Sequence, residues 1–182
     1  AALAARVLVN RVWLAHFGRG LVTTPSNFGQ SGQRPSHPEL LNDLAARFIA
    51  SGWSLKQLHR EIVFSATYRQ ASRDDGSRSE TDPDNIWLAR MPRTRLSVES
   101  WRDAMLAVSG DLDRTLGGPS VSLTDTANQR RTLYGTIHRR EMSIMLLTHD
   151  FPDPTAHSPQ RIATTTTLQG LYALNGPLVL TR

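Results

Sequence analysis

Two apolar stripes with helical spacing, separated by a very short turn, constrain the fold of this chain most. Apolar residues recur with the period of an α-helix in residues 37–50 and again in residues 54–69. Each segment follows a serine that can cap a helix, Ser36 or Ser54, with a Glu or Gln three residues later. Ser51-Gly52-Trp53 leaves room only for a tight turn. The sequence therefore predicts an αα-hairpin.

Other segments also show helical patterns. Residues 3–17 are apolar around most of the helix circumference, which indicates a buried helix. Residues 97–113 place Trp101 and Met105 on an apolar stripe and Arg102 on the opposite, polar side. Shorter helices are predicted for residues 82–91 and 167–174, whereas residues 142–147 fit a strand and a helix equally well. We expect one shared core, formed by Leu44, Phe48, Leu58, Ile62, Trp101 and Met105.

The pattern of apolar and polar residues changes after Gly117-Gly118-Pro119. Residues 121–123 and 131–137 alternate in polarity and carry β-branched and aromatic side chains, which predicts a small antiparallel pair of strands. The expected fold is therefore mainly α: one helical domain over residues 1–182, with the αα-hairpin and a small antiparallel β element in the C-terminal half. Residues 71–81 are polar and are predicted to form a surface linker. The chain opens without Met or a targeting pattern, which predicts a segment of a larger protein.

Composition excludes several classes of site and partner. The chain has no Cys, so it can hold no disulfide, iron–sulfur cluster, thiolate zinc site or c-type haem attachment of its own. The net charge is +5, but Lys56 is the only lysine, and this Arg bias favours a compositional origin over nucleic-acid binding. No apolar run has the length of a membrane span. We expect a soluble segment with no cofactor, no nucleic-acid partner and no membrane span.

The most ligand-like cluster lies in residues 149–157. His149, Asp150, Asp153 and His157 lie on a proline-stiffened loop and could meet one divalent ion. The spacing matches no established metal motif, so we expect no metal. The favoured alternative is that Asp150 and Asp153 bind backbone groups or Arg161 and so hold the terminal helix in place.

Arginines form a second group of candidates. Arg130, Arg131, Arg139 and Arg140 flank the predicted strands and could clamp a sulfate, phosphate or carboxylate group. The alternative, which we favour, is that they pair with nearby aspartates. His16 lies beside Trp13 on a helical face, and the role that we favour for it is at the edge of the core, bonded to backbone.

An ordered series of motifs runs through nearly the whole chain. It includes Asn10-Arg11-Val12-Trp13, His16-Phe17-Gly18-Arg19-Gly20, Pro35-Ser36-His37-Pro38-Glu39, Gly52-Trp53-Ser54, Ser65-Ala66-Thr67-Tyr68-Arg69-Gln70, Asp82-Pro83-Asp84-Asn85, Arg102-Asp103-Ala104, Gly117-Gly118-Pro119-Ser120, Asp150, Pro152-Asp153, Arg161, Thr164-Thr165, Gln169 and Leu174-Asn175. With these motifs the chain resembles the planctomycete-specific domain one, domain of unknown function fifteen fifty-three. His149 departs from the family, which usually has an aromatic residue there, and Gly170 replaces a common Ala.

The resemblance implies a cellular location and a set of accompanying domains, but no established activity. Members lie toward the C-terminus of large proteins predicted to be extracytoplasmic, after another uncharacterised domain. A planctomycete cytochrome c module and sugar-binding-like modules often accompany them. The resemblance therefore implies a periplasmic or cell-surface location, an upstream domain of the same polypeptide as partner, and a c-type cytochrome and a glycan as further possible partners.

Two functions follow as hypotheses. The first is a structural or ligand-binding module that works with the upstream domain and is not catalytic on its own. The second is an enzyme that acts on acidic or sulfated polysaccharide through Asp150, Asp153 and the arginines. The candidate ligand-binding residues are Arg11, His16, Arg139, Arg140, Asp150, Asp153, Arg161 and Gln169. Convergence of Arg11, Asp150, Asp153, Arg161 and Gln169 on one pocket would favour the enzyme, and separate pairs would favour the module.

Overall fold

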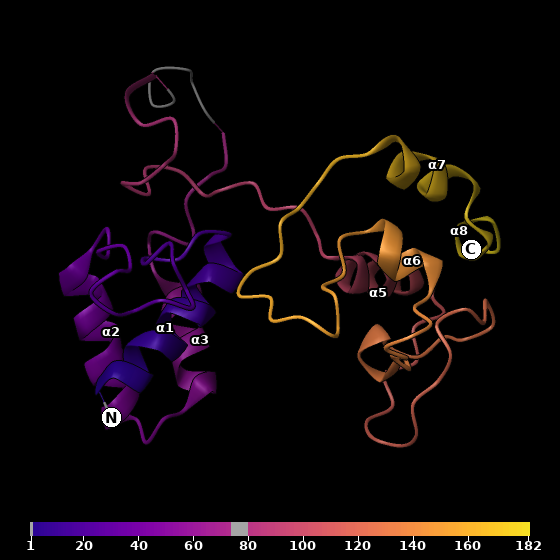
Figure 1. Ribbon diagram of the computed structural model, residues 1–182, viewed down its shortest axis with the longest axis horizontal. Coiled ribbons are helices and arrows are strands. Elements are labelled where there is room, and N and C mark those ends of the chain that lie inside the picture. The colour runs from indigo at the N-terminus through magenta and orange to yellow at the C-terminus, as the bar shows by residue number, and fades with distance from the viewer. Residues whose placement is uncertain (1, 74–79) are drawn as a thin grey trace. The chain divides into compact units, whose positions relative to one another are not determined.

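The computed structural model describes residues 2–73 and 80–182 (Figure 1). The chain divides into two compact units. Unit 1 extends to Thr94, and unit 2 runs from Arg95 to Arg182. Each unit has its own cluster of buried apolar residues. The predicted shared core is therefore wrong: Leu58 belongs to the cluster of unit 1, and Trp101 packs at the edge of the cluster of unit 2. The single domain over residues 1–182 stays a prediction.

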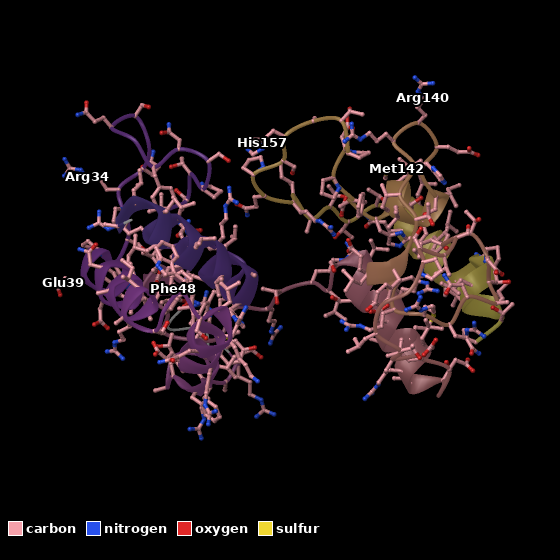
Figure 2. The ribbon with its side chains drawn as sticks, turned by 90° about the horizontal axis from the view of Figure 1, so that it is seen from below. Arg34, Glu39, Phe48, Arg140, Met142 and His157 are labelled. Carbon is pink, nitrogen blue, oxygen red and sulfur yellow. The ribbon has the colours of Figure 1, made fainter. Side chains whose placement is uncertain are left out.

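Unit 1 is built on three helices, α1 (Ala2–Phe17), α2 (Pro38–Ala50) and α3 (Leu55–Phe64). The αα-hairpin is confirmed, with α2 and α3 joined through Gly52 and Trp53, which both have positive φ. Helix α1 packs on both. Phe48 of α2 lies among the helices of this unit (Figure 2) and is only 2% exposed. The hairpin forms because each stripe buries its apolar face against α1.

Buried Asn10 of α1 fixes the start of the long loop that follows this helix. Its Nδ2 donates to the Val22 carbonyl at 3.0 Å, and its Oδ1 accepts from the Val22 N–H at 2.8 Å. Gly20 passes so close that an added Cβ would lie 2.6 Å from the Val22 carbonyl. Ser36 also donates to this loop, through the Leu21 carbonyl. The predicted capping box at Ser36 is therefore wrong, and His37 precedes α2 without a side-chain cap.

The helix predicted for residues 82–91 is replaced by turns. The Asp82 carboxylate accepts hydrogen bonds from the backbone N–H groups of Ile86 and Trp87. Asn85 binds both backbone groups of Arg90 and has a positive φ. These side chains form hydrogen bonds with backbone groups that would be paired with one another in a helix. Turns therefore form in place of the helix. Of the predicted linker 71–81, residues 74–79 lie outside the described residues.

Unit 2 contains α5 (Val98–Val108), the 3-10 turn η1 (Thr132–Tyr134), α6 (Ile144–Thr148), α7 (Thr167–Asn175) and α8 (Pro177–Leu180). The ambiguous segment at residues 142–147 is thus mainly helical. Ser97 caps α5 by accepting from the Ser100 N–H, as the sequence predicts. Thr166 and Gln169 form a complete capping box at the start of α7.

The small antiparallel β element is contradicted. The described residues contain no strand, and the chain after α5 forms only two isolated bridges, Asp113↔Arg130 and Val121↔Gly135, both parallel. The reason is η1, which curls the predicted second strand, so that only the Val121 N–H and carbonyl find partners there, in the Tyr134 carbonyl and the Thr136 N–H. The Thr132 N–H is also lost to a ladder, because it donates to the Asp103 carboxylate.

Candidate functional site

Two of the predicted site residues, Arg11 and His16, lie on α1 in unit 1. Arg11 is exposed. His16 Nε2 is hydrogen-bonded to His59 Nδ1 of α3 at 2.8 Å, and the Tyr68 ring packs edge-on against His16. Burial and the neighbouring His59 lower the pKa of the His16 imidazole. This pair joins two helices, which suits the predicted place of His16 at the edge of the core, but its partner is a side chain and not the predicted backbone group.

The other six predicted residues lie in unit 2, and Asp150 forms the densest contacts among them. Its carboxylate accepts from the Thr164 N–H at 2.9 Å and from Thr164 Oγ1 at 2.6 Å. Gln169 Nε2 donates to the same carboxylate at 3.2 Å. Arg95 completes the group by donating to Gln169 Oε1 and to the Thr164 carbonyl. We call Arg95, Asp150, Thr164 and Gln169 the Asp150 cluster.

The electrostatics of the Asp150 cluster favour an ionised carboxylate. Partial burial raises the pKa of Asp150, but the hydrogen bonds from Thr164 and Gln169 and the charge of Arg95 outweigh it, so the pKa lies below its ordinary value. The oxygens that would bind a ligand are already used by Thr164 and Gln169. Since Gln169 also closes the capping box of α7, the cluster anchors the start of that helix. The predicted contact of Asp150 with backbone is therefore present, and its structural role stays a prediction.

Asp153 and Arg161 do not join Asp150. Asp153 accepts from the N–H and the Oγ1 of Thr155, a local turn. Arg161 donates to both carboxylate oxygens of Glu99 on α5, at 2.7 and 2.6 Å. Its guanidinium also lies over the Phe151 ring, 5.0 Å from the ring centre. The predicted pairing of Arg161 with the aspartates is therefore wrong, and its partner Glu99 lies 62 positions earlier in the chain.

Aromatic rings pack beside the Asp150 cluster. His149 stacks on Trp101 with 5.6 Å between ring centres, and Tyr172 packs edge-on against His149 at 5.1 Å. His149 Nδ1 lies 2.9 Å from the Met145 carbonyl, so this nitrogen carries the proton and donates. His149 is thus held between the rings of Trp101 and Tyr172.

Arg139 and Arg140 are exposed, and Arg140 projects from a loop of unit 2 (Figure 2). The four residues of the convergence criterion that lie in unit 2 do not gather in one site. Asp150 and Gln169 share the Asp150 cluster, whereas Asp153 and Arg161 form separate pairs. Among residues 2–73 and 80–182, no three His, Asp or Glu side chains are grouped so that they could hold a metal ion.

Sequence reasoning missed the most buried polar side chain of unit 2. Arg102 is fully buried and donates to the carbonyls of Asn128 and Arg130 and to Thr132 Oγ1. It was expected on the polar side of its helix. The signal was present: Arg102 lies four residues after Val98 and four before Leu106, the two apolar residues that α5 buries.

The comparisons with known proteins identify the family. A family model described as PSD1, protein of unknown function (DUF1553), matches residues 1–182, so the chain belongs to this family. No curated protein and no solved structure was found to match it. Within the described part of the chain, no helix combines the length and the apolar character needed to cross a membrane.

Proposed function

We propose that this member of the DUF1553 family is a docking module without catalytic activity of its own. In this proposal, unit 2 binds another folded domain of the same polypeptide through apolar surfaces on α6 and α7. The proposal also includes an extracytoplasmic location and a cytochrome or a glycan as further partners. Both rest on the family resemblance. The enzyme hypothesis receives less support, because Asp150, Asp153 and Arg161 are already bound to neighbours within unit 2.

The observation that carries the proposal is the exposed leucine face of α7. Gln169 is buried and Tyr172 is half-buried, so these residues form the inner side of the helix. Leu168, Leu171 and Leu174 follow at helical spacing on the other side, and their exposed fractions lie between 51% and 72%. Leucines gathered on one exposed face indicate an interaction surface, whereas single exposed leucines do not.

Helix α6 continues the same character. It packs against α7 (Figure 1). Ile144 and Leu147 of α6 are exposed, while Met145 and Leu146 are buried. Neither α6 nor α7 contains a charged residue. A partner therefore has to be recognised by burial of apolar area. We call Ile144, Leu147, Leu168, Leu171 and Leu174 the docking face.

A partner within the same polypeptide suits a face of this modest size. Tethering raises the effective concentration of the partner to the millimolar range, so a small apolar contact is sufficient. Each fully buried leucine contributes about 1.5–3 kcal/mol. Two or three leucines would then hold the domains together without any ion pair.

The test uses the upstream part of the polypeptide, made separately, and measures its affinity for the part that carries this chain. We expect Leu168→Glu/Leu171→Glu to weaken binding at least about 100-fold, since two leucines lose their burial. The matched control is Leu116→Glu/Leu133→Glu, two exposed leucines of unit 2 outside the docking face. Wild-type binding should change little between low and high salt. Unchanged affinity in the α7 variant, or equal loss in both variants, would reject the proposal.

A further inference from the structure

A hollow in unit 2 gathers positive charge away from α6 and α7. It has a volume of about 300 Å³ and is lined by Leu112, Arg114 and Arg131. Leu112 and Arg114 follow α5, whereas Arg131 directly precedes η1. The two segments are held together by the parallel bridge between Asp113 and Arg130, with the Asp113 N–H donating to the Gln129 carbonyl at 2.9 Å.

The bridge separates the arginines into two groups. Arg130 binds its own neighbours: its Nε lies 4.0 Å from the Asp113 carboxylate, its terminal nitrogens donate to the carbonyls of Thr115, Gly117 and Pro119, and its guanidinium stacks on Tyr134. Arg114 and Arg131 are each the next residue along their segment, so they lie side by side. Side chains alternate along extended segments, and these two therefore face away from the Asp113–Arg130 pair and into the hollow.

The positive charge in the hollow is only partly compensated. Arg114 is exposed and forms no ion pair with a residue in the described ranges. Arg131 Nε lies 3.7 Å from Asp103 Oδ2. That carboxylate is shared with Arg102 at 4.0 Å, and its Oδ1 accepts two hydrogen bonds from Thr132. The single negative charge of Asp103 is shared between Arg102 and Arg131, and it does not neutralise Arg114 as well. The hollow therefore keeps a net positive charge.

Two arginines that line one hollow suit one ligand chemistry. Each presents a planar fork that binds two oxygens of the same group, and the preferred partners are oxyanions. We propose that this hollow binds a phosphate or sulfate group, with Arg114 and Arg131 as the binding residues and Leu112 as its apolar wall. The site goes beyond the docking function, because it uses none of the docking face.

The experiment titrates the full-length polypeptide with inorganic phosphate, inorganic sulfate, a sulfated oligosaccharide and a phosphorylated sugar, and measures binding by calorimetry. We expect saturable binding of at least one probe, weakened by salt. Arg114→Gln/Arg131→Gln should weaken it at least about tenfold, the equivalent of about 1.4 kcal/mol. Because Arg131 also contacts Asp103, Arg114→Gln alone serves as a second variant, and it should show a smaller loss with an unchanged melting temperature.

The matched control is Arg6→Gln/Arg34→Gln, which removes the same charge from exposed positions of unit 1 and should leave binding unchanged. A sulfated oligosaccharide that binds more tightly than sulfate assigns the group to a glycan. A phosphorylated sugar that binds more tightly than phosphate assigns it to a phosphate ester. Equal loss in the two double variants, or no saturable binding of any probe, would overturn the site. Loss of anion binding leaves affinity for the upstream domain intact, so the two proposals fail independently.

Discussion

Arg102 places a charge at a position that the helical period assigns to the core of unit 2. The side chain is fully buried, and burial lowers the pKa of its guanidinium even though Asp103 acts to raise it. It stays charged because its ordinary pKa is far above neutral pH. Its hydrogen bonds reach carbonyls 26 and 28 positions away in the chain, so they tie α5 to the segment before η1.

Replacing Arg102 with Leu should destabilise the protein strongly. Leu fits the apolar spacing of α5 but leaves the Asn128 and Arg130 carbonyls unpaired. Loss of one side of such a buried charged interaction costs about 3–5 kcal/mol. The measurement is the free energy of unfolding in urea, with Arg139→Leu as an exposed control. A loss below about 1 kcal/mol for Arg102→Leu would show that the carbonyls find other partners.

For single residues, the sequence predicts contacts between positions that are close in the chain and misses contacts between positions that are far apart in it. The caps at Ser54 and Ser97 use N–H groups three residues away, so their spacing reveals them. The contact of Asp150 with a backbone N–H was also predictable, because proline-rich loops leave N–H groups that can donate to carboxylates. The partners of Arg161 and Arg102 could not be predicted, since neither Glu99 nor the Asn128 carbonyl is near in sequence.

Helices α1, α2, α3 and α5 could be predicted because an apolar stripe is a property of a single segment. The β element failed for the opposite reason: alternation shows that a segment can pair, but side chains from elsewhere decide whether its backbone groups are free. Asp103 of α5 accepts a hydrogen bond from the Thr132 N–H, at the start of the 3-10 turn that replaces part of the predicted second strand. The same competition explains the missing helix at residues 82–91, where Asp82 and Asn85 satisfy the backbone locally.

The loop before α7 is joined to α5 by Arg161 and Glu99, and this link should depend on pH. Burial raises the pKa of the Glu99 carboxyl, but the hydrogen bonds and charge of Arg161 outweigh it, so the folded-state pKa lies below the ordinary 4.5. The stability that the pair contributes is thus present above pH 4.5. It is lost as the pH falls through the lowered pKa, because the unfolded chain takes up the proton first.

Glu99→Gln removes this charge and keeps the shape of the side chain. Since both side chains are partly exposed, we expect a loss of only about 1 kcal/mol at neutral pH. Melting temperatures of wild type and variant, measured from pH 7 down to pH 3, should differ at pH 7 and converge at the acid end. A difference that stays constant over this range would mean that the ion pair contributes nothing and that Gln acts by other contacts.

At the scale of the whole molecule, an apolar stripe in the sequence shows that a helix buries one face. The stripe does not show which helices share a core. That is why Trp101 and Met105 were placed with Leu58, although each unit buries its own cluster. The leucines of α7 look like core residues in the sequence for the same reason. Only their exposure in the structure distinguishes a docking face from a core face.

Hydroxyl-radical footprinting of the full-length polypeptide tests the docking function most directly, because it reports the solvent exposure of individual side chains. The account predicts that Leu168, Leu171 and Leu174 are protected from oxidation. Leu116 and Leu133, at least as exposed in unit 2 as the leucines of α7, should react freely in the same sample. Oxidation of the α7 leucines at the rate of Leu116 and Leu133 would contradict a covered docking face.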